Sequence, residues 1–157
     1  MDQQELNGRL LRGAMTNDIG MMEAALGDGA NLAAVREIDG ASVLMLAQTL
    51  KAIDFLLSQP GIGEVINAVN RFGANAIMVH LRGGRAKIIQ ALLDAGTDPE
   101  YIAPGMIEGM PGRTALSMTS VPIGRAPIRP YPNSARIARL LQTAIAKKTA
   151  EREAALV

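Results

Sequence analysis

Three segments of the chain repeat one pattern, an apolar run with helical spacing that closes on a glycine. The segments are 23–32 (EAALGDGANL), 54–63 (DFLLSQPGIG) and 90–99 (QALLDAGTDP). Their glycines, Gly29, Gly61 and Gly96, are spaced 32 and 35 residues apart. Glycine accepts the left-handed backbone that commonly ends a helix, so each one predicts a helix stop. A stop that recurs at this spacing predicts a repeated structural unit.

A second series of residues predicts where a shorter helix begins in each unit. Ser42, Asn75 and Thr114 each open a short apolar stretch. Side chains of these types cap helices by accepting hydrogen bonds from free backbone N–H groups. Dipeptides typical of tight turns stand just upstream: Asp39-Gly40, Gly73-Ala74 and Gly112-Arg113.

These start and stop residues predict a series of helix pairs. The predicted pairs are 10–17 with 19–28, 42–49 with 51–58, 75–82 with 85–94, and a fourth that begins at 114 and resumes near 134. Extended fingers are expected between the pairs, at about 31–39, 61–73 and 97–112. One helix pair cannot bury its apolar face alone, so the pairs must stack in a single domain over residues 1–157.

Composition limits the core and the chemistry of this stack. The core must be aliphatic, because 48% of the 157 residues are hydrophobic and only Phe55, Phe72, Tyr101 and Tyr131 are aromatic. The absence of cysteine excludes disulfides, thiolate nucleophiles and cysteine-based zinc sites. The chain shows neither a secretory signal nor an apolar run near the roughly 20 residues of a membrane helix. We therefore expect no membrane insertion and a cytoplasmic location, with export without a classical signal peptide left open.

The pattern resembles the ankyrin repeat, a unit of about 33 residues with a turn and two helices. The stretch QALLDAGTDP is similar to the family's second helix followed by Gly-Ala-Asp. RTALSM (113–118) is similar to its Thr-Pro-Leu-His opening, with Ala115 and Ser117 in place of Pro and His. The resemblance implies an all-α solenoid of about four stacked helix–turn–helix repeats, at approximately 7–37, 38–70, 71–106 and 107–145, with a C-terminal helical cap to 157. No unit carries the full signature, so another helical solenoid stays an alternative.

The resemblance also implies a function, since proteins with ankyrin stacks typically bind other proteins through finger tips and the groove of the shorter helices. The corresponding candidates for partner binding in this chain are Arg36, Asp39, Arg71, Phe72, Met110 and Arg113. A rigid stack offers a preorganised surface, which lowers the ordering cost of binding. We expect a non-enzymatic protein-binding module, such as an inhibitor or an adaptor.

The segment 119–133 (TSVPIGRAPIRPYPN) interrupts the fourth unit with four prolines. Proline favours an extended backbone and resists helix formation. Arginine and tyrosine are favoured at interface hot spots, so Arg125, Arg129 and Tyr131 are further candidates for partner binding. An insertion that merely packs against the last helix is an equal alternative. If the segment binds the partner, replacing the three residues with alanine weakens binding without unfolding the domain.

The uneven charge of the chain suggests an alternative function. Residues 1–112 contain 8 Lys and Arg against 13 Asp and Glu, whereas residues 113–157 contain 8 against 2. A basic end of this kind would suit a nucleic-acid-binding regulator, because Lys and Arg neutralise phosphates. The favoured interpretation is a solvated helix face, on which Lys147 and Glu151 have the spacing of an i,i+4 ion pair.

The sequence offers no recognisable catalytic set. His80 is the only histidine, and a catalytic base would need a nucleophile or an orienting carboxylate that does not stand near it in the sequence. Metal sites usually draw on several His or Cys residues. The sequence therefore predicts no catalytic residue, no metal site, no cofactor and no enzymatic activity, and it predicts a packed or solvated role for His80.

Overall fold

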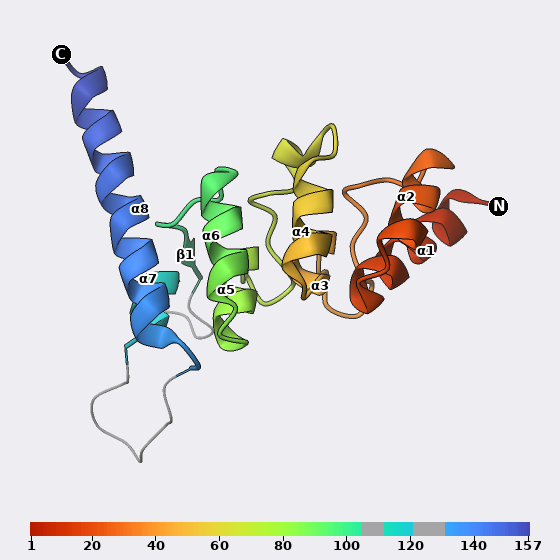
Figure 1. The fold of residues 1–157 in the computed structure, drawn as a ribbon, viewed down its shortest axis with the longest axis horizontal. Coiled ribbons are helices and arrows are strands. Elements are labelled where there is room, and N and C mark those ends of the chain that lie inside the picture. Colours follow the sequence, from red (N-terminus) through yellow and green to blue (C-terminus); the bar gives the residue numbers. More distant parts are fainter. Residues whose placement is uncertain (105–111, 121–130) are drawn as a thin grey trace.

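The protein is mostly helical, and its helices stand in a row (Figure 1). The computed structural model describes residues 1–104, 112–120 and 131–157. The helices are α1 (Gln3–Thr16), α2 (Ile19–Gly27), α3 (Val43–Leu46), α4 (Leu50–Leu57), α5 (Ala76–Arg82), α6 (Ala86–Asp94), α7 (Ala115–Met118) and α8 (Ser134–Ala155). A 3-10 turn, η1 (Ile62–Glu64), and an antiparallel hairpin of β1 (Ile102–Ala103) and β2 (Arg113–Thr114) complete the described elements.

The helices form two layers. Helices α1, α3, α5 and α7 contact one another in chain order and make the first layer. Helices α4, α6 and α8 do the same in the second layer, and α2 packs on α1. The chain termini therefore lie at opposite ends of the row, and α8 extends past its neighbours (Figure 1). Each helix pair contacts chiefly the pairs next to it in the sequence.

The start of α3 differs from the predicted capping. Asn75 accepts from the Met78 N–H at 3.0 Å and Thr114 from the Ser117 N–H at 3.1 Å, as predicted. Ser42 holds the N-cap position of α3, but its buried hydroxyl finds no hydrogen-bond partner among the described residues. The prediction of a side-chain cap at Ser42 is therefore wrong. An antiparallel bridge to Val35 holds this position instead.

The repeated glycines adopt the predicted backbone conformation. Gly29, Gly61 and Gly96 have φ angles of +102°, +84° and +104°. Nothing lies within 4 Å of where a Cβ would stand on any of them, so the conformation and not the space requires glycine. Gly29 and Gly96 directly follow the C-caps of α2 and α6. Gly61 instead opens η1, so the segment predicted to be extended at 61–73 begins with a 3-10 turn.

Helix α1 begins earlier than predicted. Asp2 and Glu5 form a reciprocal capping box there, with the Asp2 carboxylate accepting from the Glu5 N–H at 2.8 Å. This pair satisfies backbone N–H groups that would otherwise lack partners, and it extends the helix to Gln3.

Helix α3 is shorter than predicted because its neighbours take over its hydrogen bonds. Asn17 Oδ1 accepts from the N–H groups of Gln48 and Thr49 at 2.8 and 3.0 Å. The Gln48 N–H would continue the helix by donating to the carbonyl of Leu44. That carbonyl instead accepts from His80 Nε2 at 2.7 Å, on α5. Residues from both adjacent pairs thus complete a helix of four residues.

The core is aliphatic and runs through all four pairs of described helices. Its large, fully buried side chains are Leu10, Met22, Leu44, Ile53, Leu56, Ile77, Met78, Leu81, Ile89, Leu92, Ile137 and Leu141. They belong to a single cluster, as a row of mutually dependent pairs requires. Over the described residues, no helix is both long enough and apolar enough to cross a membrane.

Candidate partner-binding surface

The first finger is a closed turn between Val35 and Ser42. The Arg36 N–H donates to the Ala41 carbonyl at 2.9 Å, and the Arg36 side chain pairs with Asp39, with Nε 3.0 Å from Oδ1. The hydrogen bond from Arg36 lowers the pKa of Asp39 below its ordinary value. Arg36 and Asp39 therefore hold the turn together, and both are half-buried.

The second finger is fixed directly on the first. Asn70 Oδ1 accepts from the N–H groups of Phe72 and Ala74 at 3.0 and 2.9 Å and closes the turn. The Arg71 N–H donates to the Asp39 carbonyl at 2.8 Å. The Arg71 guanidinium also donates to the carbonyls of Glu37 and Ile38, at 2.8 and 3.3 Å.

The third finger, the β1–β2 hairpin, is joined to the second. The Tyr101 hydroxyl donates to the Gly73 carbonyl at 2.8 Å. Gly73 has a φ of +76°, and a Cβ there would stand 2.9 Å from Pro104 Cδ. Only glycine suits this close approach. We call the described finger residues, 35–42, 69–74, 102–104 and 112–114, the fingertip row.

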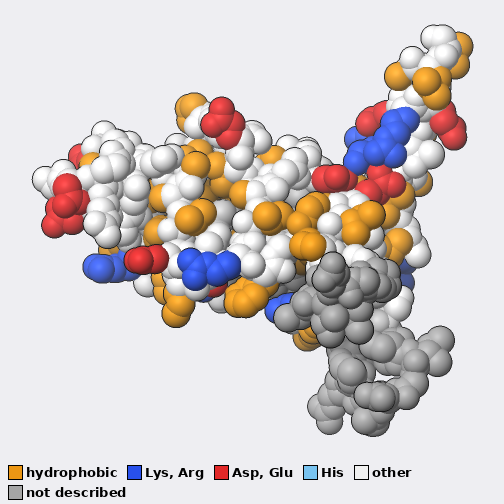
Figure 2. Space-filling model, turned by 180° about the vertical axis from the view of Figure 1, so that it is seen from behind, with side chains coloured by type: hydrophobic (Ala, Val, Ile, Leu, Met, Phe, Trp, Pro, Cys, Tyr) orange, Lys and Arg blue, Asp and Glu red, His pale blue; other side chains and the backbone are white. Residues whose placement is uncertain are grey.

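Each finger exposes at least one large hydrophobic side chain. Ile38, Phe72 and Ile102 are 77%, 69% and 62% exposed. Val35 and Met15 add two further exposed side chains, and Met15 Sδ lies 4.0 Å from the Arg36 guanidinium. Figure 2 shows hydrophobic side chains spread over the rear face, with basic and acidic side chains along its lower part and a further basic group on the protruding C-terminal helix. Exposed hydrophobic residues that recur at neighbouring positions are typical of interaction surfaces.

The sequence-predicted residues have different roles here. Phe72, Arg71 and Arg113 are exposed on the row, although Arg71 also ties two fingers together. Tyr131 is exposed beside α8. The predicted residues Met110, Arg125 and Arg129 lie outside the described residues.

Sequence reasoning missed Ile38 and Ile102. Both are hydrophobic residues within segments predicted to be turns or fingers, where polar residues are usual. That mismatch is the pattern that could have found them.

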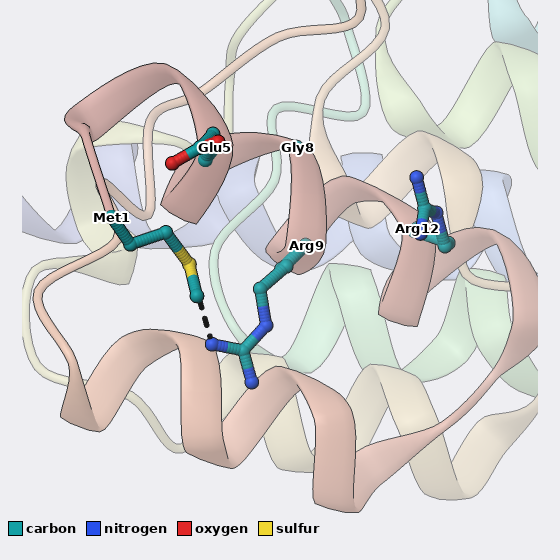
Figure 3. A pocket seen from close by; sticks show the side chains of 5 residues that line it. All are labelled: Met1, Glu5, Gly8, Arg9 and Arg12. Carbon is teal, nitrogen blue, oxygen red and sulfur yellow. Dashed lines mark hydrogen bonds between the residues drawn. The ribbon is translucent and has the colours of Figure 1, made fainter.

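Two shallow hollows lie on the surface of the described residues. The larger, about 510 Å³, lies along the outer side of α1 and is lined by Met1, Glu5, Gly8, Arg9 and Arg12 (Figure 3). The Arg9 guanidinium lies 3.5 Å from the Met1 sulfur and 3.2 Å from Asp28, while Glu5 belongs to the capping box. The second, about 370 Å³, lies over α4, α6 and α8.

His80 is packed and not solvated. Burial lowers its pKa to about 4, against the opposing hydrogen bond to the Leu44 carbonyl, and the charge of Arg85 adds to the lowering. The imidazole is therefore neutral at pH 7 and donates from Nε2. Within the part of the chain that the structure describes, no three His, Asp or Glu side chains are grouped so that they could hold a metal ion.

The basic C-terminal helix is paired with acidic residues of the preceding unit. Lys148 Nζ lies 2.7 Å from Asp98 and 3.4 Å from Glu100, and Arg152 lies 3.0 Å from Glu100. Burial raises the pKa of Asp98, but the hydrogen bond and charge of Lys148 outweigh it and leave that pKa below its ordinary value. The ion pairs of α8 among the described residues thus involve Lys148 and Arg152, and the predicted pair of Lys147 with Glu151 is not one of them.

Known proteins add no further constraint on this surface. A scan against protein-family models and a search of curated proteins each gave no match. The geometry of the fingertip row is therefore the basis for assigning a function.

Proposed function

We propose that this chain is a non-enzymatic protein-binding module of the ankyrin-like type, with about four degenerate repeats. It recognises a protein partner through the fingertip row and the adjoining first helices, and acts as an inhibitor or an adaptor. One observation carries the proposal: the fingers are bonded to one another while each exposes a large hydrophobic side chain.

Preorganisation explains why this arrangement suits binding. Turns that are already fixed by Arg71 and Tyr101 lose little freedom when a partner docks. The hydrophobic side chains then contribute their burial at small entropic cost.

The alternative of nucleic-acid binding receives less support. Two of the basic residues of α8, Lys148 and Arg152, already face carboxylates of the preceding unit. A phosphate backbone would have to compete with these ion pairs.

Affinity capture from the source cells, followed by calorimetry with the purified candidates, tests the proposal. We expect at least one protein that binds the purified chain saturably, and binding that survives nuclease treatment. The segment 119–133 is tested on the same partner with the triple alanine variant of Arg125, Arg129 and Tyr131. Salt-sensitive binding to generic DNA or RNA, with no direct protein partner, would contradict the proposal and favour the alternative.

A further inference from the structure

The charged residues of the first helices are mainly arginines. Beyond its capping box, α1 carries Arg9 and Arg12, and α5 ends with Arg82. Helices α3 and α7 carry no charged residue. Arg12 and Arg82 are exposed, and Arg12 stands one turn from the exposed Met15. Arg12 is therefore an exposed basic group close to the first finger, whose Arg36 contacts the Met15 sulfur.

Acidic residues gather instead in and after the second helices of the first three pairs. They are Asp18, Glu23, Asp28, Asp54, Glu64, Asp94, Asp98 and Glu100, against Lys51, Arg85 and Lys87. Some of these carboxylates are paired with cations of neighbouring helices: Asp28 with Arg9, Asp98 with Lys148, and Glu100 with Arg152.

The described residues of the fingertip row carry a net positive charge, with Arg36, Arg71 and Arg113 against Glu37 and Asp39. Arg36 and Asp39 neutralise each other. The contacts of the Arg71 guanidinium go to uncharged carbonyls, so they do not compensate its charge. Arg113 adds an exposed guanidinium on β2, while Glu37 is the remaining carboxylate of the described fingertip residues.

We infer that the partner presents an acidic and hydrophobic protein segment to the fingertip row. Ile38, Phe72 and Ile102 contact its apolar side chains, and Arg71 and Arg113 face its carboxylates. This inference rests on the proposed function and adds the chemistry of the partner. Arginine beside large apolar groups is the composition enriched at interface cores, and guanidinium–carboxylate bonds are among the strong ones. Opposite charge also guides the approach.

Selection from a random displayed peptide library on the immobilised full chain tests this inference. Selected peptides are synthesised with a fluorescent label and titrated by anisotropy. We expect them to combine Asp or Glu with large hydrophobic residues. Ile38→Ser and Phe72→Ser are each expected to weaken binding about tenfold or more, as loss of a buried large side chain requires. Raising the salt concentration is expected to weaken binding further.

Leu156→Ser is the matched control, because Leu156 is 87% exposed on the far end of the chain. It should leave affinity unchanged, and circular dichroism should show all three variants folded. Basic peptides, peptides indifferent to both fingertip substitutions, or repeated selections without a binder would overturn the inference. A natural partner that binds the fingertip row through a basic or uncharged segment would also overturn it but leave the proposed function standing.

Discussion

At the junction between the second and third helix pairs, the imidazole of His80 is fully buried and bonded to a carbonyl. At the fingertips of the same two pairs, Ile38 and Phe72 are largely exposed. The junction thus buries a polar group and the fingers expose apolar ones, the reverse of the usual distribution. A hydrogen bond between distant residues holds each region. The bond from His80 to Leu44 spans 36 positions at the junction, and the bond from Arg71 to Asp39 spans 32 positions at the fingers.

This comparison shows that contacts between residues 32 to 36 positions apart serve two purposes. Inside, polar side chains such as Asn17 and His80 complete the hydrogen bonds of a short helix, which an apolar side chain could not do. Outside, backbone bonds and the side chains of Asp39, Asn70 and Arg71 hold the fingers, so the exposed side chains of Ile38, Phe72 and Ile102 are not needed for folding. We therefore expect substitutions at the junctions to change stability, and substitutions of the exposed hydrophobic fingertip side chains to change binding.

The largest expected effect comes from a matched pair of isoleucines. Ile77→Ala empties a fully buried site of α5 and should lower the free energy of unfolding by about 2–5 kcal/mol. Ile38→Ala removes the same atoms from an exposed fingertip and should change it by less than about 0.5 kcal/mol. Urea denaturation measures both. Equal losses would remove the distinction between junction and fingertip.

Acidification tests the junction through His80. Its folded pKa of about 4 lies below the ordinary value of 6.5, so the folded state favours the neutral form. The contribution of His80 to the free energy of unfolding is fully present above pH 6.5. It falls as the pH drops toward 4, and the total loss is about 3 kcal/mol. His80→Gln should flatten this dependence between pH 6.5 and 4. The lowered pKa values of Asp39 and Asp98 reduce stability mainly below about pH 5, so the difference between the original chain and His80→Gln across this window isolates the histidine.

The close approach of two fingers gives a smaller effect. Gly73→Ala places a Cβ against Pro104 at a φ of +76° and should cost about 1–3 kcal/mol. Gly8→Ala is the control, because a Cβ on Gly8 meets nothing within 4 Å inside helix α1. It should stabilise the protein by up to about 1 kcal/mol. The melting temperatures of the two variants should shift in opposite directions. An unchanged melting temperature for Gly73→Ala would show that the fingers are not held tightly.

The smallest expected effect is at the ion pairs of α8. Lys148→Gln removes contacts with Asp98 and Glu100 that are partly exposed to solvent. Such pairs contribute at most about 1 kcal/mol, less in high salt. Denaturation at two salt concentrations measures the difference. A larger loss of stability that does not depend on salt would show that this contact contributes as strongly as the buried contacts at the junctions.

Much of the helical arrangement could be predicted from local sequence. The capping side chains of Asn75 and Thr114 and the left-handed glycines at 29 and 96 act within a few residues, so the sequence near them contains the needed information. The start of α1 at Asp2 was equally local, and the capping box with Glu5 was present to be recognised. Phe72 and Arg113 were named as fingertip residues and are exposed there, while their role in binding stays a prediction.

The sequence by itself determined the helix boundaries at Asn75, Thr114, Gly29 and Gly96 and the aliphatic core, because capping and periodicity depend on neighbouring residues. Only the tertiary structure decided that α3 ends after one turn, since its hydrogen-bond partners Asn17 and His80 come from the adjacent pairs. It also decided that Arg36, Asp39 and Arg71 support the fingers while Ile38 and Ile102 face solvent. Those roles depend on contacts about one repeat apart, and no local pattern specifies which side chain such a contact uses.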